Sequence, residues 1–284
     1  MIKTFFRFVL CIAVYTIIFT LSNALLPFSQ GFRELDVSGN PLGILFVLVN
    51  AAWVCFTIFF IARNSHWKGK KLFLGIVSIL FFVQSFMTQI ETLFFGDAFP
   101  VLTKLDIILI MFAGLFPLLA TTPLIIKFFQ NKHIEGESIK INIQSALIKL
   151  GIIGVIYLIV YMFFGYFVAW QFEELRVFYS GSPEKLSFFG QLVNNIKTNP
   201  VIYPFQIIRG ILFGVFVLPL VNMINKKPAL IISVCLVFLC TAFMLIIPNV
   251  LFPDKVRFAH LIEMSSSMLV FGIIVGRILW GSKT

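Results

Sequence analysis

Four ionisable side chains interrupt apolar stretches of the chain: Glu91, Arg209, His260 and Glu263. Carboxyl and imidazole groups exchange protons near neutral pH once burial shifts their pKa values, and a guanidinium attracts anionic groups. An ionisable group in hydrocarbon costs free energy, so such residues usually face the interior of a helical bundle and mark a substrate or proton pathway. We therefore take these four residues as the centre of a candidate site.

Helical spacing brings further polar residues to the same site. Gln84, Thr88 and Glu91 are four and three residues apart, which places them on one face of an ideal helix. His260 and Glu263 are three residues apart and share a face in the same way. The candidates added by spacing and position are Gln84, Thr88, Gln206, Arg257 and Asp106.

His260, Glu263 and Glu91 also form a candidate metal site. Imidazole and carboxylate ligands together suit zinc, iron or manganese. The His-x-x-Glu spacing is not diagnostic, and the second copy that di-iron helical bundles use is missing from the sequence. A divalent metal is therefore one alternative, and the sequence requires no cofactor.

A purely structural role is the main competing interpretation of these charges. Charged residues within membranes usually occur in pairs, and an ion pair of Arg209 with Glu91 or Glu263 would hold helices together without any catalysis. His260 would then form a hydrogen bond beside the pair.

The composition indicates which elements must position these side chains. The chain has 284 residues, of which 60% are hydrophobic and 12% charged, and its mean hydropathy is +1.01. A soluble domain carries about 25% charged residues, so a soluble globule is excluded. The apolar runs do not alternate as barrel strands do, which favours an all-α, polytopic membrane bundle over residues 1–284 as a single transmembrane domain.

Eight segments are long and apolar enough to cross a bilayer, which takes about 20 residues. They are Phe5 to Leu26, Leu42 to Ala62, Leu72 to Phe95, Val101 to Phe129, Ser145 to Trp170, Val201 to Ile224, Ala229 to Leu251, and Phe258 to Trp280.

The distribution of Lys and Arg predicts the orientation of these segments. With both termini in the cytoplasm, most basic residues fall inside, and the loop from Arg63 to Lys71 is strongly basic. This predicts a plasma membrane or bacterial inner membrane protein. Lys3 and Arg7, followed by an apolar run and Ser22-Asn23-Ala24, also resemble a cleaved signal peptide, which would leave seven spans.

The connection over residues 171–199 is predicted to be extracytoplasmic. Ser182 and Pro183 suit the start of a helix, and apolar residues then recur at helical spacing. We expect a short amphipathic helix lying on the outer leaflet.

This topology places the candidate polar residues in the outer half of the membrane, as a polar pocket. The leading hypothesis is a transporter or permease for a small polar or ionic solute. One alternative is an enzyme that acts on a lipid or lipid-linked substrate at the outer leaflet, and another is a non-catalytic sensor or complex subunit. The expected partner is the lipid bilayer and not nucleic acid, since no nucleic-acid-binding motif accompanies the net charge of +10.

Overall fold

The computed structural model describes all residues except 1, 35–42, 137–141, 250 and 282–284. Within the described residues the chain forms helices and no strand, and eight helical segments are long and apolar enough to cross a membrane. They consist of α1 (Ile2–Leu25), α3 (Gly43–Asn64), α4 (Gly69–Leu80) with the π-helix η1 (Phe81–Phe86) and α5 (Met87–Phe94), α6 (Lys104–Ala113) with α7 (Leu115–Phe129), α8 (Ile143–Phe167) with η3 (Ala169–Gln171), α11 (Ile202–Met223), α12 (Lys227–Phe243) with η4 (Met244–Ile246), and α13 (Asp254–Trp280).

The predicted number of spans is therefore confirmed for the described part of the chain. Four short helices lie between the spans: α2 (Gln30–Arg33), η2 (Gly96–Ala98), α9 (Glu173–Ser180) and α10 (Phe188–Thr198). Leu42, where the second predicted span begins, lies outside the described residues.

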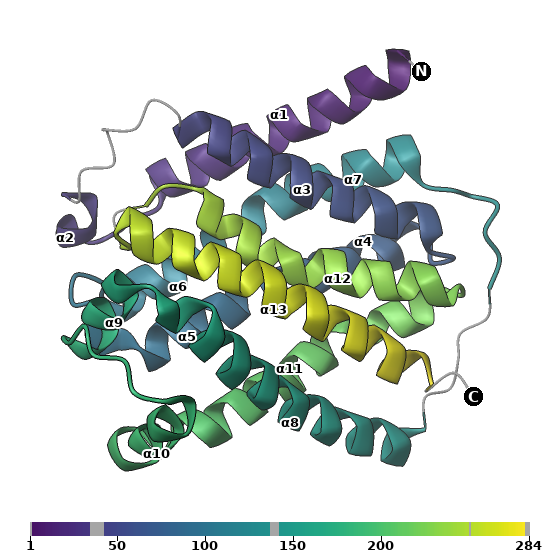
Figure 1. Ribbon diagram of the computed structural model, residues 1–284. Helices are drawn as coiled ribbons and strands as arrows, with labels where there is room; N and C mark the ends of the chain where they lie inside the picture. The colour runs from purple at the N-terminus through teal and green to yellow at the C-terminus, as the bar shows by residue number, and fades with distance from the viewer. Residues whose placement is uncertain (1, 35–42, 137–141, 250, 282–284) are drawn as a thin grey trace.

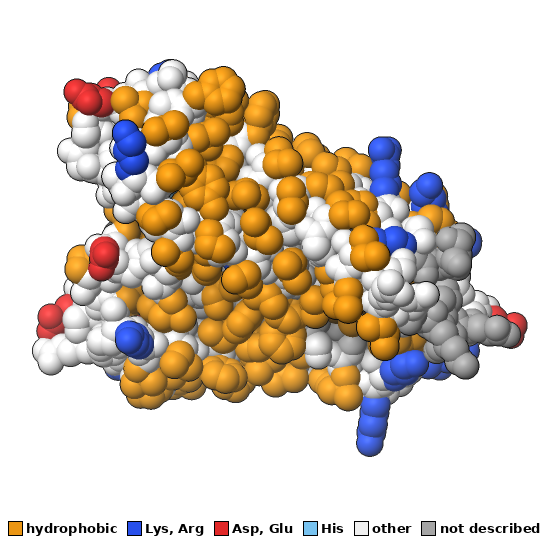
Figure 2. All heavy atoms as spheres, turned by 90° about the horizontal axis from the view of Figure 1, so that it is seen from below, with side chains coloured by type: hydrophobic (Ala, Val, Ile, Leu, Met, Phe, Trp, Pro, Cys, Tyr) orange, Lys and Arg blue, Asp and Glu red, His pale blue; other side chains and the backbone are white. Residues whose placement is uncertain are grey.

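The long helices run between two ends of the bundle (Figure 1). The start of α1 and the end of α13 lie at one end, which we call the terminal end, and α2, α9 and α10 lie at the other, which we call the α9 end. Figure 2 shows a broad apolar band between charged groups at the two ends. Leu147, Ile159 and Phe163 on α8 are at least half exposed, as expected for side chains that face lipid.

Glycines allow close packing of the spans around the candidate site. A Cβ added at Gly210 of α11 would lie 2.8 Å from Cα of Gly154 on α8, and one at Gly272 of α13 would lie 2.9 Å from Cα of Cys235 on α12. Small residues at helix contacts let two backbones approach closely, which is a common means of association in membranes. The α8–α11 and α12–α13 contacts thereby fix the helices that carry Arg209 and His260.

The π-helix η1 changes the side of the third span on which its residues lie. A π-helical turn holds about one residue more than an α-helical turn, so the ideal-helix spacing does not hold across it. Gln84 lies within η1, is buried, and sits beside the Tyr15 hydroxyl of α1. Thr88 donates hydrogen bonds of 2.9 Å to the carbonyl oxygens of Gln84 and Ser85. Gln84 therefore contacts α1, whereas Thr88 and Glu91 both lie within α5, where the α-helical spacing of three residues holds.

The surface helix of the 171–199 connection begins later than the sequence suggested. The helix α10 starts at Phe188, and Ser187 caps it by accepting a hydrogen bond of 3.2 Å from the Gly190 amide. Ser182 and Pro183 precede α10 in an irregular stretch, so the predicted cap at Ser182 is wrong. The described helix exposes Phe189, Val193 and Ile196, which recur at helical spacing.

Candidate functional site

Arg209 and Glu91 form an ion pair between α11 and α5 near the α9 end. The two terminal guanidinium nitrogens of Arg209 donate to the two carboxylate oxygens of Glu91 at 2.6 and 2.7 Å. The Arg209 side chain is 2% exposed and the Glu91 side chain is 27% exposed. A bidentate arginine–carboxylate contact fixes both groups in direction as well as in distance.

Neighbours on α11 complete the surroundings of Arg209. Gln206, one turn earlier and fully buried, accepts a hydrogen bond of 2.9 Å from Arg209 Nη1 through its Oε1 atom. The guanidinium lies 5.6 Å from the ring centre of Tyr157 on α8 and 5.7 Å from that of Phe205. Aromatic faces of this kind stabilise a cation where water is excluded.

A second group of polar side chains joins α9 to α13. The Tyr179 hydroxyl and His260 Nε2 lie 3.0 Å apart, and which of the two donates depends on the histidine tautomer. His260 Nδ1 lies 3.9 Å from Glu263 Oε2, a distance that suits an ion pair when the imidazole is protonated but is too long for a hydrogen bond. The His260 imidazole thus lies between the Tyr179 hydroxyl and the Glu263 carboxylate.

The two groups are electrostatic neighbours. The carboxylates of Glu91 and Glu263 both interact electrostatically with the Tyr179 hydroxyl. Together with Arg209, they also interact electrostatically with the hydroxyls of Tyr157 and Tyr161 on α8. Burial, followed by these two carboxylates, raises the pKa of Tyr179, so its hydroxyl stays protonated at neutral pH. The structure thus brings Glu91, Gln206, Arg209, His260 and Glu263 into one cluster, which we call the outer cluster, together with Tyr157, Tyr161 and Tyr179.

Asp106 lies apart from the outer cluster and ties two segments together. It accepts hydrogen bonds from the amide and hydroxyl of Ser29 at 2.7 Å each, and from those of Thr103 at 3.0 and 2.6 Å. Thr103 in turn caps the first turn of α6, which makes a capping box with Asp106. Four hydrogen bonds occupy its carboxylate, which is 1% exposed.

Arg257 is also occupied elsewhere. Its Nη1 donates to the carbonyl oxygens of Leu245 and Ile246 at 2.9 Å each, and its Nη2 pairs with Asp254 at 2.6 Å. Arg257 therefore fixes η4 to the start of α13, although it shares a helix with His260.

The proposed metal ligands do not assemble in the part of the chain that the structure describes. No group of three His, Cys, Asp or Glu side chains there is placed to hold a metal ion. Glu91 faces Arg209, whereas Glu263 faces His260. The three proposed ligands are therefore divided between two separate contacts.

Sequence reasoning missed the three tyrosines of the outer cluster. Tyr157 and Tyr161 are four residues apart on α8, a spacing that places two hydroxyls on one helix face. Tyr179 is found in a connection, where no apolar run marked it as unusual. Tyrosine takes part in proton transfer, so the first two could have been added to the candidates from spacing alone.

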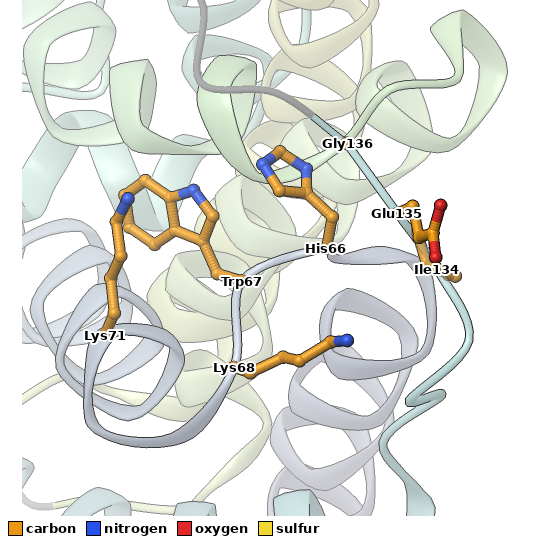
Figure 3. A pocket seen from close by; sticks show the side chains of 7 residues that line it. All are labelled: His66, Trp67, Lys68, Lys71, Ile134, Glu135 and Gly136. Carbon is orange, nitrogen blue, oxygen red and sulfur yellow. The ribbon is translucent and has the colours of Figure 1, made fainter.

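Two hollows open at the ends of the bundle. One of about 500 Å³ lies between α9 and α13 and is lined by Phe172, Glu174, Asp254, Lys255 and Phe258. The other, of about 380 Å³, lies at the terminal end beside the start of α4, away from the outer cluster (Figure 3). There the Lys71 amine lies 4.1 Å from the centre of the Trp67 ring, while the exposed Glu135 side chain points away from it.

No protein-family model matches the chain, and neither a curated protein nor a solved structure is significantly similar to it.

Proposed function

We propose that this protein transports a small polar or ionic solute across the membrane and that the outer cluster is its binding site. The observation that carries the proposal is the fully buried Arg209 side chain, which keeps unused hydrogen-bonding capacity next to groups that exchange protons. A purely structural ion pair would satisfy its own donors and would need neither His260 nor Glu263 beside it.

In this proposal Arg209 and Gln206 bind the solute. Glu91 neutralises Arg209 while the site is empty, which makes the empty site stable within hydrocarbon. The chain of Tyr179, His260 and Glu263 takes up or releases a proton as access to the site changes. We further propose that the α9 end faces the extracytoplasmic side, as the distribution of basic residues predicts.

Solute uptake into proteoliposomes tests the proposal. The purified full chain is reconstituted and offered labelled carboxylates, amino acids, sugars and organic cations. Arg209→Lys and Glu263→Gln should each lower uptake about 10- to 100-fold, as expected for losing one charged hydrogen bond. The exposed Glu184→Gln variant is the control and should behave as wild type. Wild-type uptake by both site variants would remove these residues from the mechanism.

A second candidate is an enzyme that acts on a lipid or lipid-linked substrate at the same end. The order of hydroxyl, imidazole and carboxylate in Tyr179, His260 and Glu263 suits general acid–base chemistry. The exposed apolar side chains of α10 would suit an amphiphilic substrate. Mass spectrometry of lipids incubated with wild type and with His260→Ala would detect such a reaction, and unchanged lipids in both samples would count against it.

A further inference from the structure

Two buried donors of the outer cluster have no hydrogen-bond partner among the described residues. Arg209 uses Nη1 and Nη2 on Glu91 and Gln206, but its Nε has no partner among the described residues. Nε2 of Gln206 also has no partner there. The direction of the Gln206 amide is fixed because its oxygen must accept from Arg209, so the unpaired atom is a donor.

Burial makes these unpaired donors informative. The Arg209 side chain is 2% exposed and Gln206 is 0% exposed, so neither donor reaches bulk water. An unpaired buried donor costs about 1–3 kcal/mol, which a suitable acceptor would recover. A simple cation offers no acceptor for these donors, and a sugar hydroxyl is itself a donor that would need a further acceptor. A carboxylate offers only acceptors, with about four lone-pair sites on two oxygens.

We propose that the outer cluster binds the carboxylate of a small solute through Arg209 and Gln206, and that each carboxylate enters together with one proton. This inference rests on the proposed transport function, for which it names the class of substrate and the coupling ion.

The charges around Arg209 require the proton. The groups that face the guanidinium are Glu91 on α5 and Tyr157 and Tyr161 on α8. Glu263 on α13 is an electrostatic neighbour of the same two tyrosines, and Tyr179 and His260 adjoin it. One arginine and two carboxylates give a net charge of −1 when His260 is neutral. A bound carboxylate would make this −2 in a region poor in water, which is strongly unfavourable.

Uptake of one proton by His260, Glu263 or Glu91 restores the original charge. The solute carboxylate and the proton come from the same side and leave together on the other side. For a monocarboxylate the transported charge is therefore zero, so a pH gradient drives uptake while a membrane potential does not.

The test uses proteoliposomes of the full chain with the membrane potential set by potassium and valinomycin. Labelled short-chain mono- and dicarboxylates and acidic amino acids are offered beside mannitol and choline, and a trapped pH dye reports the lumen. Carboxylate uptake should occur when the outside solution is more acidic than the lumen. The lumen should acidify by one proton for each monocarboxylate taken up, and the membrane potential should not change that uptake. Protein-free liposomes give the passive flux.

Two leucine variants link the uptake to the unpaired donors. Gln206→Leu should weaken carboxylate uptake about tenfold or more, since one hydrogen bond to a charged group is lost. Gln89→Leu on α5 is the matched control, because the Gln89 amide donates only to the neighbouring Thr88 hydroxyl. Thermal unfolding of both variants with and without the carboxylates separates loss of binding from loss of folding.

The possible failures can be told apart. Uptake of mannitol or choline that depends on Arg209, or carboxylate uptake driven by the potential without protons, would overturn this inference and leave the transport function standing. If no solute is taken up and no carboxylate raises the unfolding temperature, both proposals are wrong.

Discussion

Replacing Glu91 by Leu should destabilise the protein more than replacing Arg209 by Met, although both substitutions break the same ion pair. The asymmetry follows from burial, since the Arg209 side chain is 2% exposed and that of Glu91 is 27% exposed. A guanidinium left alone cannot lose its proton, whereas a lone carboxylate can gain one and can also reach solvent.

The magnitudes follow from the contacts that each variant removes. Glu91→Leu removes the acceptors of the 2.6 and 2.7 Å hydrogen bonds and leaves a buried charge, which costs about 3–5 kcal/mol. Arg209→Met leaves a partly exposed carboxyl and the Gln206 oxygen without a donor, and should cost about 1–3 kcal/mol. A triple variant, Glu91→Leu, Arg209→Met and Gln206→Leu, removes the ion pair together with the Gln206 amide that bonds to it, and should return close to wild-type stability.

Equilibrium unfolding in mixed micelles, followed by circular dichroism, measures these differences. The exposed Glu184→Gln variant is the control and should leave the unfolding midpoint nearly unchanged. The reasoning is refuted if Arg209→Met costs more than Glu91→Leu, or if the triple variant is no more stable than the single Glu91→Leu variant.

Three further predictions concern packing, capping and pH. Gly210→Ala should lower the free energy of unfolding by about 1–3 kcal/mol, since its Cβ would lie 2.5 Å from Tyr157 Cβ. Gly165→Ala is the control, because a Cβ there meets open space and should not destabilise the protein. Equal effects of the two variants in thermal unfolding would refute the close contact. Asp106→Ala should cost about 1–3 kcal/mol and leave solute transport intact, because its carboxylate serves only Ser29 and Thr103; lost transport in folded protein would contradict this. The hydrogen bond from Lys255 lowers the pKa of Glu174, so this contact stabilises the folded protein above the unfolded-state pKa, and the stabilisation is lost as pH falls through the folded-state pKa. The difference in melting temperature between wild type and Glu174→Gln should therefore vanish at acidic pH. A difference that stays constant with pH would exclude this linkage.

The sequence predicted the helical spans well because hydrocarbon imposes one dominant requirement. Each span must satisfy its backbone internally and expose apolar side chains, so length and hydropathy identify it. Among the described residues the helix bounds depart from the predicted segments by a few residues, as with α1, predicted to begin at Phe5 and observed from Ile2. The orientation of the termini remains a prediction.

The candidate site was predictable only in part, because side-chain direction depends on local geometry. Charge alone allowed Arg209 to pair with either Glu91 or Glu263, and in the packed structure its partner is Glu91. Gln84 was assigned to the wrong surface because nothing in its spacing reveals the π-helix over Phe81–Phe86. Asp106 is a candidate by its position at the start of the fourth span, whereas its spacing of three residues from Thr103 matches a capping box, which the structure forms.

A break in the fourth span is also not visible in the spacing of its residues. The helix is interrupted at Gly114, between α6 and α7, whereas Pro123 lies inside the continuous helix α7. A Cβ at Gly114 would lie 2.2 Å from the Ser85 hydroxyl oxygen, so the break occurs where this span packs tightly against the π-helix. Contacts between distant parts of the chain determine such a position, and spacing along one helix does not.

Solute uptake by the triple variant of Glu91, Arg209 and Gln206 tests the transport function most directly. This variant is expected to keep the folded bundle while it lacks the polar groups that bind the solute. With its unfolding midpoint close to that of wild type, we predict that carboxylate uptake into proteoliposomes falls to the level of protein-free liposomes. Wild-type uptake by the folded triple variant would contradict the assignment of the outer cluster as the transport site.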